Sequence, residues 1–464
     1  MRRLARPAMP ARHRPSAPAR PTRSAGRATL AVAALASAAA LVLAACGGGG
    51  DAGAPPPPAA PADCLALPDA VRWFAAVDAQ DWNDVLVDAQ QRVWLAGWAG
   101  GRLGESNLGP SGDSRAVLQV LDAGGRTLWD SGRELDSPGT DVAEALALSP
   151  GGTVFVAGRS TGALGGGNAG QFDSFVAWHD APATAAGWRR FQHGDAAPQQ
   201  PRRLGLAGDG ALLLAGHDEV HVVDRAVQRW ADPFALRLES GAEGGDRLAL
   251  RWQHRFETAA QDTLDALAVA ADGATYLGGS AGGSTPGPWV RKLDAAGRQL
   301  WHQRYAASAA DNIAALRMLP DGSLLVAGTT IGSFQGGTAH GQQDAFVARL
   351  AAEDGRVLAV WQHGSAHSDW VTDMAVDRDG NIVVLGETLG TLVPGQVAAG
   401  ASDLFLLRLA PDGRLLAARQ WGTAEDELAR RVAVDRCGRI VAVGASQHDG
   451  RRAGLLWFWA PDRP

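Results

Sequence analysis

The chain has 464 residues, a net charge of −6 and an apolar fraction of 46%, which is ordinary for a folded protein. Residues 1–45 contain eight of the 43 basic residues and none of the 49 acidic ones, so the rest of the chain has a net charge of −14. A domain this acidic is a poor partner for nucleic acid or for anionic lipid surfaces, so we expect neither as a partner.

Residues 1–45 are predicted to be a signal peptide of the lipoprotein type. A basic leader is followed by the alanine-rich run ATLAVAALASAAALVLAA, which is too short and too closely followed by Gly and Pro to favour a membrane span. The last three residues of this run and Cys46 resemble the lipobox of bacterial lipoproteins, in which the cysteine is lipidated. The alternative is an ordinary cleaved signal peptide beside a chance cysteine.

Residues 46–63 are predicted to be a lipidated cysteine followed by a Gly/Pro-rich tether, GGGGDAGAPPPPAAPA, which cannot build a core. Gly47, rather than aspartate, follows Cys46, and by the same resemblance this implies the outer membrane, with the protein facing the periplasm or the cell surface. The folded domain is expected to span residues 64–464, to be monomeric, and to meet the membrane through the lipid anchor alone.

One motif recurs seven times along the folded part. Its clearest copy is VDRDGNIVVLG, and the copies end at glycines 49 to 63 residues apart: Gly97, Gly158, Gly216, Gly279, Gly328, Gly386 and Gly444. Each copy reads as a hairpin with a two-residue turn, often Asp-Gly. A second hairpin lies between copies, as in LFLLRLAPDGRLLAARQW. Four strands repeated seven times predict an all-β fold, a seven-bladed β-propeller.

The two ends of the repeat region are expected to close the ring. VRWFAAV at 71–77 matches the fourth strand of a repeat, and GLLWFWA at 454–460 matches the third. Pairing them completes the seventh blade and removes free sheet edges. Tryptophans that recur at one repeat position are expected to pack between blades: Trp73, Trp129, Trp252, Trp301, Trp361 and Trp421.

The motifs DAFVARL, GRVLAVWQHGS and DWVTDMAVDRDGNIVVLGET are similar to the bacterial seven-bladed β-propeller repeat, abbreviated SBBP. The similarity covers roughly residues 70–460, and it is weak at 180–255, where the spacing is irregular. Since this family is defined mostly by its fold, the resemblance implies the propeller and brings little function.

The strand order also predicts the two faces. The turns between the first and second and between the third and fourth strands of a blade are short and share one face. The long connections, such as TTIGSFQGGTAHGQQDA, share the other face, and adaptable loops on a rigid scaffold are where partners usually bind. Cys64 and Cys437 are both expected on the short-turn face, and an even pair in an oxidising compartment suggests a disulfide that fastens the closing blade.

Charged residues recur near the start of the innermost strands, at the expected mouth of the central channel. These candidate ligand-binding residues are Asp84, Glu144, Arg203, Asp265, Asp373 and Arg431. Charges that converge on a narrow mouth focus the local field and could hold a sugar, a cation or a peptide. The competing interpretation, which we favour, is that strand ends near solvent are simply polar.

The sequence predicts no cofactor, no metal and no catalytic residue. HDEVH at 217–221 lacks the glutamate after the first histidine that a zinc protease helix needs, and Asp377, Asp379 and Asn381 fit a hairpin turn better than a calcium loop. The favoured function is a non-enzymatic envelope lipoprotein that binds or scaffolds a protein or glycan partner. The alternative is a carbohydrate-active or other hydrolytic enzyme using the acids at the channel mouth.

Overall fold

A computed structural model of the chain describes residues 64, 69–74, 80–103, 110–131, 135–180, 187–219, 221–223, 226–229, 231–240, 247–256, 260–305, 311–396, 398–448 and 451–461. The chain divides into two units, Met1–Pro58 and Ala59–Pro464. The proposed signal peptide and Cys46 lie outside the described residues. No helix in the described part of the chain has the length and apolarity needed to span a bilayer.

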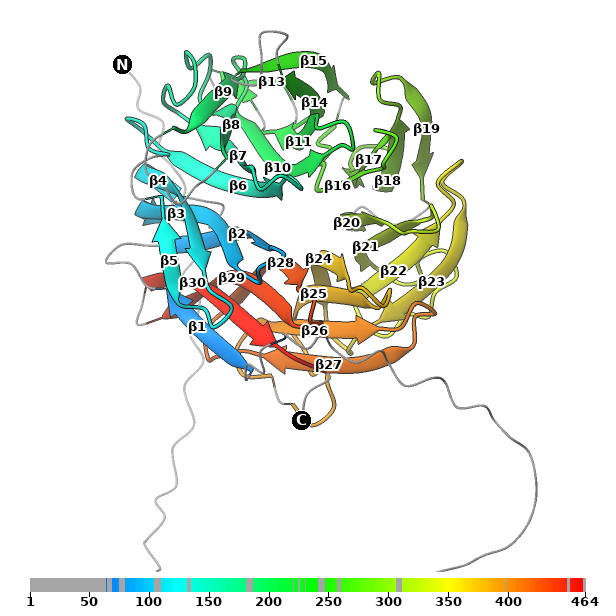
Figure 1. Ribbon diagram of the computed structural model, residues 1–464. Helices are drawn as coiled ribbons and strands as arrows, with labels where there is room; N and C mark the ends of the chain where they lie inside the picture. The colour runs from blue at the N-terminus through cyan, green and yellow to red at the C-terminus, as the bar shows by residue number, and fades with distance from the viewer. Residues whose placement is uncertain are drawn as a thin grey trace, which may run out of the picture. The chain divides into compact units, whose positions relative to one another are not determined.

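The second unit is a seven-bladed β-propeller, as the repeat predicts, with each blade a four-stranded antiparallel sheet (Figure 1). We name the strands of a blade A to D from the centre outward. The A strands are β2 (Gln80–Val87), β6 (Asp141–Leu148), β10 (Gln199–Leu206), β16 (Ala266–Val269), β20 (Asn312–Met318), β24 (Asp369–Val376) and β28 (Glu427–Val434). The B strands are β3 (Val93–Leu103), β7 (Val154–Ser160), β11 (Leu212–Asp218), β17 (Thr275–Ala281), β21 (Leu324–Thr330), β25 (Ile382–Thr388) and β29 (Ile440–His448).

The C strands are β4 (Pro110–Leu121), β8 (Asp173–His179), β14 (Pro233–Ser240), β18 (Gly287–Leu293), β22 (Asp344–Leu350), β26 (Asp403–Leu409) and β30 (Arg451–Trp459). The D strands are β5 (Thr127–Asp130), β9 (Arg189–His193), β15 (Leu248–Arg255), β19 (Gln299–Arg304), β23 (Val357–His363), β27 (Leu415–Trp421) and β1 (Ala70–Phe74). Blade 3 also carries a separate hairpin, β12 (His221–Val223) and β13 (Ala226–Arg229), between its B and C strands. This insertion explains the irregular repeat spacing there.

The ring closes in blade 7, where the first and last described strands pair. Strand β1 lies antiparallel to β30, with Trp73 opposite Leu455, and in Figure 1 the blue and red strands are adjacent. The prediction that the seventh blade takes one strand from the N-terminal end and three from the C-terminal end is therefore confirmed.

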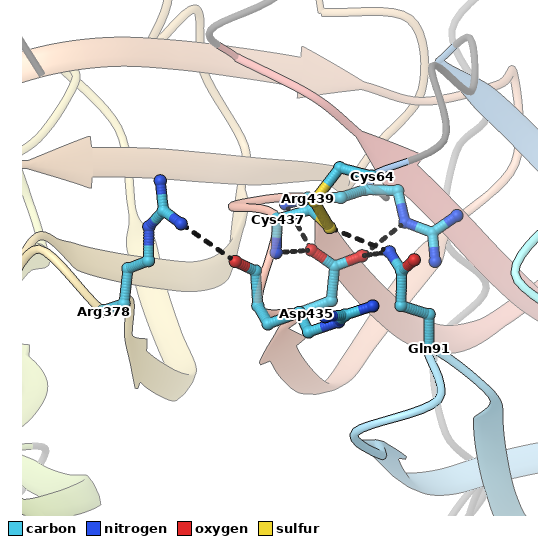
Figure 2. The surroundings of a disulfide bond; sticks show 7 residues. Cys64, Gln91, Arg378, Asp435, Cys437 and Arg439 are labelled. Carbon is cyan, nitrogen blue, oxygen red and sulfur yellow. Dashed lines mark hydrogen bonds and ion pairs between the residues drawn. A yellow bond between two sulfur atoms is a disulfide. The ribbon is translucent and has the colours of Figure 1, made fainter. Parts of the chain in front are cut away.

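A disulfide between Cys64 and Cys437 lies at this closure, with a Cα–Cα distance of 5.7 Å (Figure 2). Cys437 is in the A–B turn of blade 7, and its backbone N–H donates to Asp435 Oδ1 at 2.8 Å. Gln91, in the A–B turn of blade 1, donates from Nε2 to Asp435 Oδ2 at 3.3 Å. The disulfide thus joins the chain that precedes the first strand to the short-turn face of the last blade.

The A–B turns contain three residues, not the two expected from the sequence. In blade 6, the Asp377 N–H donates to the Asn381 carbonyl at 2.9 Å and Gly380 N–H to the Asp377 carbonyl at 3.0 Å. Gly380 has φ of 80°, so the loop is a type I turn followed by a left-handed residue. Asp377 Oδ1 accepts the Asp379 and Asn381 N–H groups, which explains the acid at the start of this turn in blade 6.

The apolar core lies between the blades. One cluster joins blade 1 to the closing blade through Trp82, Leu95, Val443 and Phe458, all buried. The repeated tryptophans follow the prediction, since five of them pack against clusters shared by neighbouring blades: Trp129, Trp252, Trp301, Trp361 and Trp421. The side chain of Trp73 lies outside the described residues.

Candidate functional site

A cavity of about 460 Å³ lies at the centre of the ring, between the A strands. Among its lining residues are four of the six predicted site residues, Asp84, Arg203, Asp373 and Arg431, together with Arg317. Glu144 and Asp265 do not line it. The structure therefore brings together part of the predicted set and adds one cation that sequence reasoning missed.

In six of the seven A strands a β-bulge sets the direction of these side chains; the pairing of β16 in blade 4 shows no shift. In blade 6 the pairing with the B strand shifts between Val371 and Asp373, and in blade 1 it shifts between Trp82 and Asp84. The bulge places the carbonyl of the preceding A-strand residue over the glycine that ends the repeat motif, so a Cβ at Gly386 would collide with the Trp370 carbonyl oxygen. Every copy of the motif ends in glycine for this reason.

The sequence alignment treated the six predicted residues as equivalent positions of the repeat. In the structure they occupy two different positions. Asp84, Arg203, Asp373 and Arg431 directly follow the bulge and pair with the B strand. Glu144 is the extra residue of its bulge, skipped between Ala143 and Ala145, and Asp265 precedes the first paired residue of β16. The two positions form an inner group and an outer group of charges.

In the inner group, Asp373 is fully buried and accepts hydrogen bonds from two blades. Its Oδ1 accepts from Arg317 Nη2 at 3.3 Å and lies 3.6 Å from Arg203 Nη2. Its Oδ2 accepts the Val432 N–H at 3.1 Å. Because both carboxylate oxygens are engaged, Asp373 ties blades 3, 5, 6 and 7 together across the channel.

Asp84 is held by backbone groups rather than by a close arginine. Oδ1 accepts the Val85 N–H at 2.8 Å, Oδ2 accepts the Leu146 N–H at 2.7 Å, and Arg431 Nε lies 4.0 Å away. Burial raises the pKa of Asp84 to about 7, the nearby Asp373 charge adds to the rise, and the hydrogen bond from Leu146 opposes it. Asp84 therefore changes charge near neutral pH.

The outer group consists of ion pairs near the start of the A strands. Glu144 lies 3.2 Å from Arg159 Nε, and burial raises the pKa of Glu144 against the pull of that arginine. Asp265 lies 3.4 Å from Arg202 Nε; burial alone would raise its pKa, but His217 and Arg202 together hold it below the usual value.

The arginines of this group were not among the predicted site residues. Asp81 accepts from Arg430 Nη2 at 3.1 Å and from Arg452 Nη2 at 2.7 Å. Arg202 and Arg430 each directly precede an arginine assigned to the channel, so the doubled Arg-Arg pairs in two A strands were the available signal. The ion pairs of Asp265 and Asp81 join neighbouring blades, whereas Glu144 pairs with an arginine of its own blade.

The long-loop face is held by a repeated contact between an aspartate and a glutamine. In blade 5, Gln362 Nε2 donates to Asp344 Oδ2 at 2.7 Å, and both side chains are buried. Gln362 Oε1 accepts the Phe334 N–H at 3.2 Å, while Asp344 accepts the His340 N–H at 2.7 Å. We call this arrangement the Asp–Gln clamp, because it fixes both halves of the B–C loop.

The same clamp recurs in two other blades. Gln192 Nε2 donates to Asp173 Oδ2 at 3.2 Å in blade 2, and Gln420 Nε2 donates to Asp403 Oδ2 at 2.8 Å in blade 6. The sequence signal is Asp-x-Phe at the start of these three C strands, in DSF, DAF and DLF. These loops are thus fixed by buried contacts, whereas the sequence alone suggested adaptable segments.

Among the residues that the structure describes, no group of three or more His, Cys, Asp or Glu side chains is arranged to hold a metal ion. Asp377, considered above as part of a calcium loop, receives hydrogen bonds from Asn381 Nδ2 at 2.8 Å and Arg408 Nη2 at 2.9 Å. Its carboxylate therefore serves the turn and the neighbouring C strand.

Comparisons with known proteins do not assign a function to this chain. No protein-family model matches the chain, and no curated protein sequence matches it. Among solved structures, Sqt1 from Chaetomium thermophilum is 12% identical, with 80% of this chain and 81% of that chain covered and a TM-score of 0.46. A protein of unknown function from Bacteroides caccae is 15% identical, with 47% of this chain and 67% of that chain covered and a TM-score of 0.29.

A third structure, of a candidate gluconolactonase, is 12% identical, with 84% of this chain and 93% of that chain covered and a TM-score of 0.37. None of these similarities assigns a function to this chain. The similarity to the SBBP repeat rests on sequence motifs alone. The structure establishes that the chain is a seven-bladed β-propeller with four-stranded blades.

Proposed function

We propose that this protein is a non-enzymatic lipoprotein of the bacterial outer membrane whose long-loop face binds or scaffolds a partner. The observation that carries the proposal is the Asp–Gln clamp, which fixes the B–C loops of blades 2, 5 and 6. A surface whose loops are already ordered loses less conformational entropy on binding, so it is well suited to recognition.

Two exposed apolar side chains on this face favour a protein partner over a glycan. Ile331 and Leu389 are 49% and 41% exposed, and each directly follows the B strand of its blade. They begin the clamped loops of the adjacent blades 5 and 6. Apolar residues presented on a fixed scaffold supply contact area that a protein surface can bury.

A lipid anchor at Cys46 is compatible with a long-loop face that points away from the membrane. Cys64 is fixed to the A–B turn of blade 7, on the short-turn face. A tether that leaves from that face would direct the long loops away from the membrane. Replacement of Cys46 by Ser should release the protein from the outer-membrane fraction, and retention of this variant in the membrane would contradict the lipid anchor.

The binding proposal is tested by placing a photo-crosslinking amino acid at Ile331 or at Leu389 in cells. Leu300, which is 54% exposed on the outer strand of blade 4, serves as the matched control position. We expect one covalent product at the two loop positions and none at Leu300. Asp344→Ala, which removes the clamp of blade 5, should reduce the product at 331. Identical products from all three positions would contradict the proposal.

A hydrolytic enzyme is the second candidate, and one observation favours it. The pKa of Asp84, raised by burial to about 7, would let this residue act as an acid or base near neutral pH. Against it, Asp373 and Glu144 are engaged with arginines. Turnover of any glycoside or ester that disappears in Asp84→Asn and Asp373→Asn, with ligand binding retained, would establish the enzyme and refute the non-enzymatic role.

A further inference from the structure

The central cavity carries more positive than negative charge. Among the described residues that line it, the charged side chains are Arg203, Arg317, Arg431, Asp84 and Asp373. With both acids ionised, the lining has a surplus of one positive charge, in a domain that is acidic overall. Buried charges are stable when they are paired, so this surplus calls for an anion.

The arginines retain donors for such an anion. Arg203 is buried, and its Nε and Nη1 have no hydrogen-bond partner among the described residues. Arg317 is the most exposed of the three, with 34% of its side chain accessible, against 10% for Arg203 and 12% for Arg431. Arg317 donates to the Leu316 carbonyl and to Asp373, which leaves other N–H groups of its fork for a ligand.

A second and larger cavity, of about 1160 Å³, adjoins the first. Leu86, Leu146 and Leu204 line both cavities, so these side chains lie at the boundary between them. The larger cavity extends along the ends of the A strands of blades 1 to 3 and over Trp94 and Trp129. We call it the apolar vestibule.

The polar residues that line the vestibule are mostly engaged in local contacts. Asp88 Oδ2 accepts from Arg92 Nε at 2.6 Å and from Trp94 Nε1 at 2.9 Å. Asp180 accepts from Thr153 Oγ1 at 2.7 Å and from Arg189 Nη2 at 2.6 Å. The surface that remains for a ligand is formed chiefly by leucine and tryptophan, which suits an alkyl chain.

We propose that the central cavity and the apolar vestibule together bind an amphipathic monoanion, a long-chain carboxylate. The carboxylate pairs with Arg317 and Arg203, and the alkyl chain passes Leu86, Leu146 and Leu204 into the vestibule. A carboxylate supplies the single negative charge that balances the surplus, and arginine binds it through two parallel hydrogen bonds. A cation would add to the surplus, and a neutral sugar would leave it unbalanced.

The site is tested by calorimetric titration of the full chain carrying Cys46→Ser, which removes the proposed lipid attachment. Decanoate is the probe, and octanoate and hexanoate measure the contribution of the chain. Each added methylene that enters an apolar site should tighten binding roughly fourfold. Equal affinity for hexanoate and decanoate, or no binding of decanoate, would overturn the proposal.

Ligands with the same decyl chain and different headgroups separate the contribution of the negative charge to affinity from that of the alkyl chain. Decanol and decylammonium should bind at least roughly tenfold more weakly than decanoate, because they lack the charge that the arginines attract. Decyl phosphate tests the choice of headgroup. If it binds more tightly than decanoate, the assignment of a carboxylate is wrong, and if decanol binds equally well, the anion site itself is refuted.

Two pairs of variants locate the ligand. Arg317→Gln should weaken decanoate binding roughly tenfold or more, while Arg317→Lys keeps the charge and retains part of the affinity. Arg349→Gln, on the C strand of the same blade, should leave binding unchanged. Unaltered binding by Arg317→Gln would remove the proposed headgroup site.

Leu206→Gln, at the half-buried end of β10, should flatten the dependence of affinity on chain length. Val434→Gln is the matched control, because Val434 ends the A strand of blade 7 and lines neither cavity. Melting curves of all variants confirm that they are folded. If Val434→Gln impairs decanoate binding as much as Leu206→Gln does, the vestibule is not where the chain lies.

Discussion

Gln91 Nε2 donates a hydrogen bond to Cys437 Sγ at 3.0 Å, which connects the A–B turn of the first blade to that of the last across 346 positions of sequence. Gln91 has φ of 60°, a left-handed conformation that six equivalent turns assign to glycine: Gly152, Gly210, Gly273, Gly322, Gly380 and Gly438. The side chain thus compensates for backbone strain with a contact at the ring closure (Figure 2).

Gln91→Ala should lower the free energy of unfolding by about 1–2 kcal/mol, because it keeps the strained backbone and loses the contacts with Asp435 and Cys437. Gln91→Gly loses the same contacts but relieves the left-handed strain, which is worth about 1 kcal/mol. Denaturant unfolding of the two variants checks the order of stability. A glycine variant that is no more stable than the alanine variant would contradict this account.

The Cys64–Cys437 disulfide should stabilise the closing blade. Cys437→Ser is expected to lower the free energy of unfolding by about 2–4 kcal/mol, since the crosslink restricts the unfolded chain. Unfolding curves with and without a reductant measure the effect. The reductant should reproduce the loss in the wild type and leave Cys437→Ser unchanged; a reductant that affects both proteins equally would point to a cause other than the disulfide.

The glycine that ends each repeat motif should tolerate no side chain. In Gly386→Ala the new Cβ would meet the Trp370 carbonyl and the Phe405 ring, so we expect a loss of about 2–4 kcal/mol in the free energy of unfolding. Gly167→Ala, where a Cβ would have no neighbour within 4 Å, should change it by less than about 0.5 kcal/mol. Similar stabilities of the two variants, measured by urea unfolding, would refute the explanation of the motif.

Stability should depend on the protonation of Glu387. Burial raises the pKa of Glu387 from 4.5 to about 7, although its carboxylate accepts the Ala429 N–H at 2.8 Å. The folded state therefore binds this proton more tightly than the unfolded chain, so the free energy of unfolding falls as the pH rises from about 4.5 to about 7.

Glu387→Gln removes this titration and keeps an oxygen for the Ala429 N–H. The variant should be more stable than the wild type at pH 8, and its advantage should shrink at pH 5, where Glu387 is protonated in the folded protein. Urea unfolding at the two pH values provides the measurement. An advantage of the same size at both would show that the titration of Glu387 is not its cause. Asp84, whose pKa is also about 7, continues to titrate in both proteins.

The architecture could be predicted from local signals in the sequence. Seven copies of a motif with strand-like runs and an acidic turn predicted seven four-stranded blades, and the orphan strands at the two ends predicted how the ring closes. This was possible because the signals are local: a turn residue, an apolar strand and a repeat period each depend on neighbours within a few positions.

Which charged side chains contact one another depends on the packing of the blades. Alignment placed Glu144 and Asp265 with Asp84 and Asp373, but Glu144 is the extra residue of its bulge and Asp265 precedes the first paired residue of β16. Asp84 and Asp373 instead pair with the B strand directly after a bulge. Arg317 joins Asp373 from another blade, 56 positions away, and the Asp–Gln clamp links residues 17 to 19 positions apart across a blade. Such contacts depend on strand register and on the angle between blades, which composition and spacing do not encode.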